Sequence, residues 1–326
     1  GVNSDGELGV GGEVNAGVPT VAGGGMGAFR SVSAGRTHGL GIGTNGTLWA
    51  WGDGSFGRLG VESLEGSAVP VQVGSDPGWR SVAAGQSHSL AVKEDGTLWA
   101  WGLNDRGRLG VEGAVTLAVP TRVGGDSDWG SVAAGGTHTL ALKTNGTLWA
   151  WGSNQRGQLG VGELAGTTNA VQVGGDSDWV MVEAGRAHSL ALKRDGTLWA
   201  WGENGDSQLG NSAMEFTNAP VLVAASGGWR GIAAGDSHSL GIRLDGTLWG
   251  WGRNSEAEVD GTGVAVTEPR QIGSDSDWRS VSAGFRHSLA TRADGSIWFW
   301  GFDAYGEGGQ QKGYAPRDIG GGGQWT

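Results

Sequence analysis

The chain has 326 residues, including 68 glycines and 18 tryptophans, and a formal net charge of −11. So much glycine without a collagen period, beside so much tryptophan, indicates tight turns around a packed aromatic core and excludes a disordered chain. The acidic charge argues against nucleic acid and an anionic membrane as partners, and the lack of cysteine excludes disulfides and thiolate chemistry. The compartment stays open, with a soluble, secreted or cell-surface protein favoured over a cytoplasmic one.

One eight-residue pattern recurs six times and sets the organisation of the chain. Its clearest copy is Asp195-Gly196-Thr197-Leu198-Trp199-Ala200-Trp201-Gly202. The other copies are Asn45–Gly52, Asp95–Gly102, Asn145–Gly152, Asp245–Gly252 and Asp294–Gly301. Counted from the glycine that closes the pattern, repeat units start at residues 1, 52, 102, 152, 202, 252 and 301, a period of 49 to 51 residues. This period predicts a solenoid, propeller or array, here one domain over residues 1–326.

The chain begins inside a repeat unit. Residues 3–9 have the phase of residues 154–160, which follow the tryptophan pattern in a later unit. Residues 18–21 occupy the same position in the repeat as residues 119–122, which belong to the last β-strand segment of their unit.

Each complete unit contains four short segments with β-strand character, as residues 180–223 illustrate. Residues 180–184 predict strand A, and residues 189–193 predict strand B after a tight connection. Asp195-Gly196 predicts a type I′ hairpin turn with positive φ at both residues, leading into strand C at 197–201. Strand D follows at 219–223, and its Pro220 fits an outermost strand with a free edge. No segment shows a 3.6-residue apolar period, so we expect no substantial helix.

Four antiparallel strands per unit predict an all-β fold, a β-propeller of four-stranded blades. Strands A to C occur six times, whereas strand D occurs seven times, first near Val18 and last near Pro316. We therefore expect a seven-fold ring whose seventh blade is incomplete; the alternative is six blades with a spare N-terminal segment. An open blade would expose strand edges that could pair with another chain.

The repeat resembles that of the regulator of chromosome condensation family, most closely its bacterial type. The residues that carry the resemblance are Ala184-Gly185-Arg186-Ala187-His188-Ser189-Leu190, the pattern at 195–202, Asn204, and Gln208-Leu209-Gly210. The resemblance covers essentially the whole chain. It implies a β-propeller, usually of seven blades, that binds other proteins through one face.

Histidine and tryptophan occupy fixed repeat positions, and we assign them structural roles. Repeat symmetry spreads the histidines one per blade, so they cannot converge on a metal site or a catalytic triad. We therefore expect no catalytic residue, no metal and no cofactor. The histidines would tie strands together, and the first tryptophan of each pattern would fill the wedge between blades. These residues are His38, His88, His138, His188, His238 and His287, with Trp49, Trp99, Trp149, Trp199, Trp249 and Trp298.

Three D–A connections carry an Asp-Ser-Asp motif, at 126–128, 176–178 and 275–277. Short polar side chains of this kind commonly cap turns. Alternate carboxylates also suit Ca²⁺, which is the alternative interpretation.

The A–B and C–D connections share one face of such a ring, and the B–C turns and D–A connections share the other. The first face varies between repeats, so we place partner recognition there. Its arginine and aromatic content is typical of protein interfaces. The candidate residues are Arg36, Phe56, Arg58, Gln86, Asp105, Arg106, Arg156, Arg186, Asp206, Asp236, Phe285, Arg286 and Tyr305.

These features favour a non-enzymatic scaffold that binds another protein through the variable face. One alternative is a guanine-nucleotide exchange factor for a small GTPase, which the family resemblance suggests. Repeat lengths of 49 to 51 residues leave no room for the inserted wedge that this activity uses. A second alternative is a surface or filament subunit that self-associates through N-terminal or C-terminal strand edges of an open blade.

Overall fold

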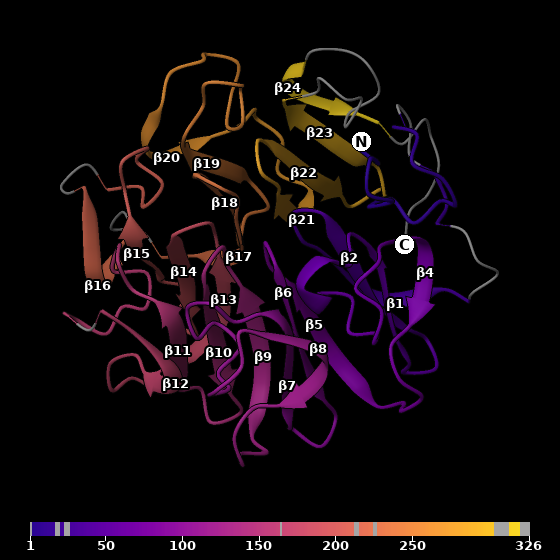
Figure 1. Ribbon diagram of the computed structural model, residues 1–326. Coiled ribbons are helices and arrows are strands. Elements are labelled where there is room, and N and C mark those ends of the chain that lie inside the picture. The colour runs from indigo at the N-terminus through magenta and orange to yellow at the C-terminus, as the bar shows by residue number, and fades with distance from the viewer. Residues whose placement is uncertain are drawn as a thin grey trace.

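The computed structural model describes residues 2–16, 20–22, 27–163, 165–211, 215–223, 227–302 and 313–319. Within these ranges the chain forms six four-stranded antiparallel sheets arranged as blades around a central axis (Figure 1). The prediction of an all-β propeller is confirmed. In these residues the one helical segment is the short 3₁₀ turn η1 (Ser55–Gly57), and no helix is long and apolar enough to cross a membrane.

Each blade is built from four consecutive strands, in the order A, B, C, D from the axis outward. The first blade consists of β1 (Phe29–Ala34), β2 (His38–Gly43), β3 (Leu48–Gly52) and β4 (Ser67–Gln72), and the second of β5 (Trp79–Ala84), β6 (His88–Lys93), β7 (Leu98–Leu103) and β8 (Thr116–Arg122). The third blade consists of β9 (Trp129–Ala134), β10 (His138–Lys143), β11 (Leu148–Ser153) and β12 (Gly166–Gln172), and the fourth of β13 (Trp179–Ala184), β14 (His188–Lys193), β15 (Leu198–Glu203) and β16 (Phe216–Leu222). The fifth blade consists of β17 (Trp229–Ala234), β18 (His238–Arg243), β19 (Leu248–Gly252) and β20 (Val266–Gln271), and the sixth of β21 (Trp278–Ala283), β22 (His287–Arg292), β23 (Ile297–Gly301) and β24 (Gly313–Asp318).

The expectation of a seven-fold ring with an incomplete seventh blade is wrong. The structure has six blades in its described residues, and each blade has its own strand D. The last of these, β24 around Pro316, pairs with β23 and completes the sixth blade. Residues 20–22 are not in a strand, and Val18 lies outside the described residues. The open blade, whose strand edges could have paired with another chain, is therefore not present among the described residues.

The N-terminal segment 2–16 instead packs on the first blade as a C–D loop does. Asn3 Oδ1 accepts from Leu8 N at 2.9 Å, as Asn154 Oδ1 accepts from Leu159 N at 2.8 Å. The indole of Trp51 donates to Glu7 O at 2.9 Å. The segment that shares its repeat position with a C–D loop therefore also forms the hydrogen bonds of such a loop.

The hairpin at Asp195-Gly196 differs from the type I′ turn that we predicted. Gly196 has φ +81°, but Asp195 is not among the described non-glycine residues with positive φ. Gly196 N donates to Lys193 O at 2.9 Å, and Lys193 N donates to Thr197 O at 3.0 Å. These bonds describe a type I turn followed by a left-handed glycine. Asp195 Oδ1 accepts from Thr197 Oγ1 at 2.7 Å, which explains why Asp or Asn precedes the glycine.

The second tryptophan of each pattern fastens one blade to the loop before it. Trp101, Trp151, Trp201, Trp251 and Trp300 are fully buried. Trp201 Nε1 donates to Gln158 O at 2.9 Å, so the indole of one blade satisfies a carbonyl in the C–D loop of the preceding blade. The same bond recurs at each of the other four tryptophans. The core is therefore a chain of inter-blade contacts, and it fixes the loops at one face.

Candidate functional site

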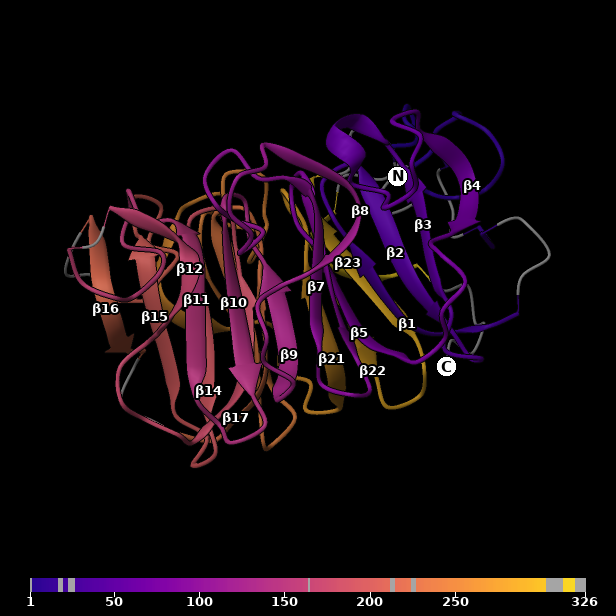
Figure 2. The ribbon, with the colours of Figure 1, turned by 60° about the horizontal axis from the view of Figure 1, so that its bottom comes forward.

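The connections between strands gather at two opposite faces of the ring (Figure 2). On one face, which we call the A–B/C–D face, each C–D loop is hydrogen-bonded to the A–B turn of its own blade. Leu103 N donates to Ser87 O, and Glu203 N donates to Ala187 O, each at 2.9 Å. On the opposite face, B–C turns bond to D–A connections, as Trp79 N does to Gly46 O at 3.2 Å.

A buried histidine relay stabilises the A–B/C–D face. His138 Nε2 lies 2.9 Å from Ser189 Oγ of the next blade, and Ser189 Oγ donates to Gln158 O at 2.8 Å. Because the serine gives its one proton to that carbonyl, His138 Nε2 must be the donor and carries a proton. Burial lowers the pKa of His138 to about 3. The histidine–hydroxyl contact recurs at five blade junctions, His38–Ser89, His88–Thr139, His138–Ser189, His188–Ser239 and His238–Ser288.

The relay changes where the sixth blade meets the first. Gly39 occupies the position of Ser89, and a Cβ there would lie 2.3 Å from Trp51 Cε2. The tryptophan ring therefore takes the space of the missing hydroxyl. His287, on the sixth blade, is half-buried and its ring stacks on Phe299 at 5.7 Å between centroids.

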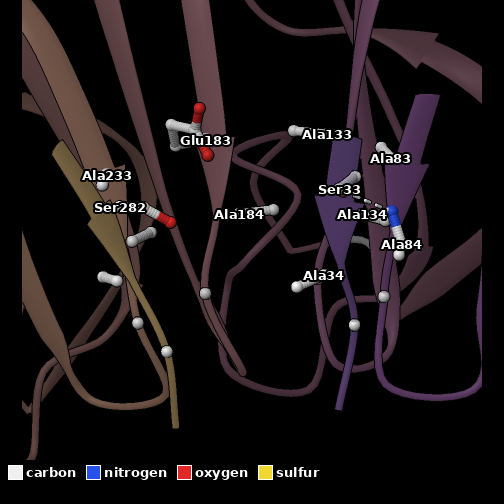
Figure 3. A pocket seen from close by; sticks show the side chains of 18 of the residues that line it. Ser33, Ala34, Ala83, Ala84, Ala133, Ala134, Glu183, Ala184, Ala233 and Ser282 are labelled. Atoms are coloured by element: carbon white, nitrogen blue, oxygen red, sulfur yellow. Dashed lines mark hydrogen bonds between the residues drawn. The ribbon is translucent and has the colours of Figure 1, made fainter. Parts of the chain in front are cut away.

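The inner strands enclose a central channel of about 660 Å³ (Figure 3). Its wall consists mostly of small or branched side chains at three successive positions of strand A, such as Val132, Ala133 and Ala134. The A–B turns form its mouth, where the lining residues include Arg36, Gln86, Arg186, Asp236 and Phe285. Five of the predicted face residues therefore lie together around one opening.

The mouth combines exposed charge with an exposed aromatic ring. Arg186 reaches Glu203 at 3.1 Å and Asp236 at 3.7 Å. Burial raises the pKa of Asp236, although nearby arginines oppose the shift. Phe285 is 44% exposed, and the guanidinium of Arg36 lies 5.4 Å from its ring centroid across the junction of the first and sixth blades. Such a surface offers both apolar area and hydrogen-bond donors.

The C–D loops place the remaining predicted residues at different depths. Phe56, Arg106 and Arg156 are exposed at the loop tips. Asp105 is exposed and paired with Arg108. Asp206 and Arg286 are half-buried. The guanidinium of Arg286 lies 3.9 Å from the carboxylate of Glu256 and 5.2 Å from the ring centroid of Phe285. Tyr305 lies outside the described residues.

Arg58 is buried, unlike the other arginines in the predicted set. Its guanidinium pairs with Asp53 at 2.9 Å and donates to Thr37 Oγ1 at 2.6 Å. Burial is the main cause that lowers its pKa. The structure therefore places Arg58 inside the loop framework, beneath the surface that a partner would meet.

Sequence reasoning missed a repeated cation site on the opposite face. Lys193 Nζ lies 4.9 Å from the ring of Trp179 and 5.2 Å from that of Trp199, and it pairs with Asp176 at 2.7 Å. The same arrangement holds Lys143 at Asp126, and Arg292 at Asp275. The Asp-Ser-Asp carboxylates are therefore engaged by a cation from strand B. The described residues contain no group of three or more His, Asp or Glu side chains able to hold a metal ion.

Glu183 also went unnoticed in the sequence. It stands on the wall of the channel, where the equivalent residues of the other blades are alanine or serine (Figure 3). An alignment of the six repeats would have exposed it, because it breaks a run of small residues at one position.

Comparisons with known proteins agree with this architecture. The profile of the RCC1-like domain matches residues 1–225, and that of the regulator of chromosome condensation (RCC1) repeat matches residues 229–257 and 278–307. The structure of Prp20p from Saccharomyces cerevisiae, described with its binding properties to Gsp1p and histones, is similar with a TM-score of 0.85. It is 26% identical, over 98% of this chain and 84% of that chain.

Two further structures are similar. Yeast RCC1 (Prp20) bound to Kap60 matches with a TM-score of 0.77 and 26% identity, over 89% of this chain and 74% of that chain. Human WBSCR16 shares the fold, with a TM-score of 0.81 and 22% identity over 90% of this chain and 82% of that chain. No curated protein sequence matches the chain significantly.

Proposed function

Because the chain belongs to the family of RCC1-like domains, we propose that it is a non-enzymatic scaffold that binds another protein through its A–B/C–D face. The observation that carries this proposal is the cluster at the channel mouth. There the exposed ring of Phe285 lies beside Arg36, and Arg186 stands on the same rim. Aromatic and arginine side chains dominate the energetics of protein interfaces.

A rigid frame beneath these residues supports the proposal. The A–B turns that carry Arg186 and Phe285 follow inner strands of the ring. In the blade before each of them, a hydroxyl and an indole donate to one carbonyl of the C–D loop, Gln158 O and Glu258 O respectively. A preorganised surface loses little conformational entropy on binding. Phe56, at 46% exposure, and the exposed Arg106 and Arg156 extend the surface outward from the mouth.

The relatives provide independent support for a protein partner. Prp20p is described with its binding to Gsp1p and histones, and the yeast protein is also seen bound to Kap60. Binding to Gsp1p keeps nucleotide exchange as the second candidate function. Stimulated nucleotide release from a purified small GTPase would favour that candidate over a passive scaffold.

The test is affinity capture from extracts of the source organism, analysed by quantitative mass spectrometry. A variant with Arg36→Ala, Arg186→Ala and Phe285→Ala removes the mouth cluster. A matched control, Arg194→Ala, Arg279→Ala and Leu244→Ala, removes two exposed arginines and one exposed apolar side chain from the opposite face. We expect the first variant to lose the proteins that the natural chain and the control retain. Loss in the control with retention in the mouth variant would contradict the proposal.

A further inference from the structure

Strand A of each blade contributes one residue to each level of the channel wall. At one of these levels the side chains are small and neutral in every blade except the fourth. The residues at this level are Ser33, Ala83, Ala133, Glu183, Ala233 and Ser282. Five of these six positions carry small neutral side chains. Figure 3 shows the Glu183 carboxylate standing in the channel among them. The levels on either side are formed by valine or isoleucine and by alanine. At these three levels the side chains of the wall are therefore mostly apolar, and Glu183 supplies the one carboxylate.

No protein cation neutralises this carboxylate. Among the described residues, none forms a hydrogen bond or an ion pair with the side chain of Glu183. Burial is the one cause that raises its pKa, to about 7, so neighbouring charges contribute no opposing shift. Glu183 is half-buried on the channel wall, and an ionised carboxylate that has lost part of its hydration is stabilised by a cation or a donor.

Most charged groups at the two ends of the channel are engaged elsewhere. At the mouth, Arg186 is paired with Glu203 and Asp236, and Arg36 lies over Phe285. At the start of strand A, Arg30, Arg80 and Arg230 each donate to the backbone carbonyl of a tryptophan on the next blade. Arg279, at the equivalent position of the sixth blade, is exposed and causes no shift in the pKa of Glu183. The carboxylate of Glu183 is thus left for a group that enters from solvent.

The chemistry of the wall selects the kind of cation. Ca²⁺ or Mg²⁺ requires several oxygen ligands, usually with more than one carboxylate, and this level offers one carboxylate and the hydroxyls of Ser33 and Ser282. An alkylammonium ion matches better, because its head forms a charge-assisted hydrogen bond with a carboxylate and its stem packs on valine and alanine.

We propose that the central channel is a binding site for an organic cation, an ammonium head on an apolar stem, with Glu183 as its counter-ion. The ammonium group belongs either to a small amine or to a lysine side chain that a protein inserts through the mouth. Glu183 lies in β13, three residues before Arg186 of the following A–B turn, so the carboxylate is within roughly 10 Å of the rim, the length of three extended residues.

The test uses the full chain and isothermal titration calorimetry at pH 8.5, where both Glu183 and the amine are ionised. The probes are hexylammonium, the neutral hexanol, and the peptide acetyl-Gly-Lys-Gly-amide. We expect hexylammonium to bind at least tenfold more tightly than hexanol. Its affinity should fall about tenfold per pH unit below pH 7 as Glu183 becomes protonated. Binding of hexylammonium alone identifies a small-amine site, and binding of the peptide as well identifies a lysine site.

Two variants and a control make the assignment specific. Glu183→Ala reproduces the residue found at this position in three other blades, so the fold should tolerate it. Glu183→Gln keeps the shape without the charge. Both should weaken hexylammonium binding at least tenfold, whereas Glu62→Gln, at an exposed carboxylate on a C–D loop, should leave it unchanged. Equal affinity in the natural chain and the two Glu183 variants, or no binding of hexylammonium, would overturn the proposal. Both results would leave capture of a partner at the mouth untouched.

Discussion

Replacing Ser189 by alanine tests the histidine relay quantitatively. In the structure, Ser189 Oγ donates to Gln158 O at 2.8 Å and accepts from His138 Nε2 at 2.9 Å, with both side chains fully buried. Alanine removes both bonds. Gln158 O keeps the indole of Trp201, at 2.9 Å, but His138 Nε2–H is left without an acceptor.

The expected cost follows from these losses. The bond to Gln158 O contributes about 1 kcal/mol net, and the His138 donor left without a partner costs about 1–3 kcal/mol, which includes the loss of its own bond. The total is about 2–4 kcal/mol of the free energy of unfolding. The chain provides its own control, because Thr139 holds this position in the preceding blade, donating to Arg108 O at 2.7 Å. Ser189→Thr should therefore cost less than about 1 kcal/mol.

Urea unfolding, followed by tryptophan fluorescence, measures both variants. We expect Ser189→Ala to be the less stable of the two by more than about 1 kcal/mol. If the two variants unfold at the same urea concentration, the hydroxyl does not connect the blades, and the relay has no energetic role.

Three further changes probe other parts of the ring. Burial lowers the pKa of His38, His138, His188 and His238 to about 3 in the folded protein, against about 6.5 unfolded. The folded state thus binds fewer protons, so stability is full above pH 6.5 and falls as pH drops, by roughly 5 kcal/mol for these four at pH 5.5. Urea unfolding at pH 7.5 and 5.5 measures this loss in the Glu183→Ala variant, because the raised pKa of Glu183 in the natural chain would oppose the effect of the histidines. The same free energy of unfolding at both pH values would contradict the prediction. Lys193→Ala should lower the free energy of unfolding by about 1–2 kcal/mol, because the cation loses its contacts with two tryptophan rings. Lys193→Arg should leave stability unchanged, since Arg243 and Arg292 occupy the equivalent position in other blades. Equal melting temperatures for the two variants would contradict a contribution from the cation. Trp199→Ala should lower the free energy of unfolding by about 2–4 kcal/mol, because that indole is half-buried. Below its melting temperature the variant should still capture the partner. Loss of capture without loss of stability would show that Trp199 contacts the partner.

Sequence periodicity predicted the blades well because each blade is local. The tryptophan pattern, the glycine turn and the apolar strands of one unit lie within about 50 residues, and each strand pairs with its neighbour in sequence. The number of blades was harder to obtain. The residues typical of strand D occur seven times in the sequence, first near Val18, whereas strands A to C occur six times, so the count alone did not decide between six and seven blades.

The burial and pairing of individual side chains were harder to predict than the strands. Arg58 and Arg106 both read as exposed loop arginines, yet Arg58 is buried against Asp53 while Arg106 is exposed at the loop tip. Lys193 and Asp176 are separated by 17 residues, and only the folded blade shows that they pair. Glu183 faces the channel because strand A is innermost, which the spacing of the repeats does not encode.

Site-specific photocrosslinking tests the proposed binding face most directly. p-Benzoylphenylalanine is placed at Phe285, on the rim of the channel mouth, and separately at Leu244, which is 71% exposed in a B–C turn of the opposite face. Each labelled chain is irradiated in an extract of the source organism, and crosslinked proteins are identified by mass spectrometry. We expect a specific protein crosslinked from position 285 and not from position 244. A partner crosslinked from position 244 and not from position 285 would contradict recognition through the A–B/C–D face.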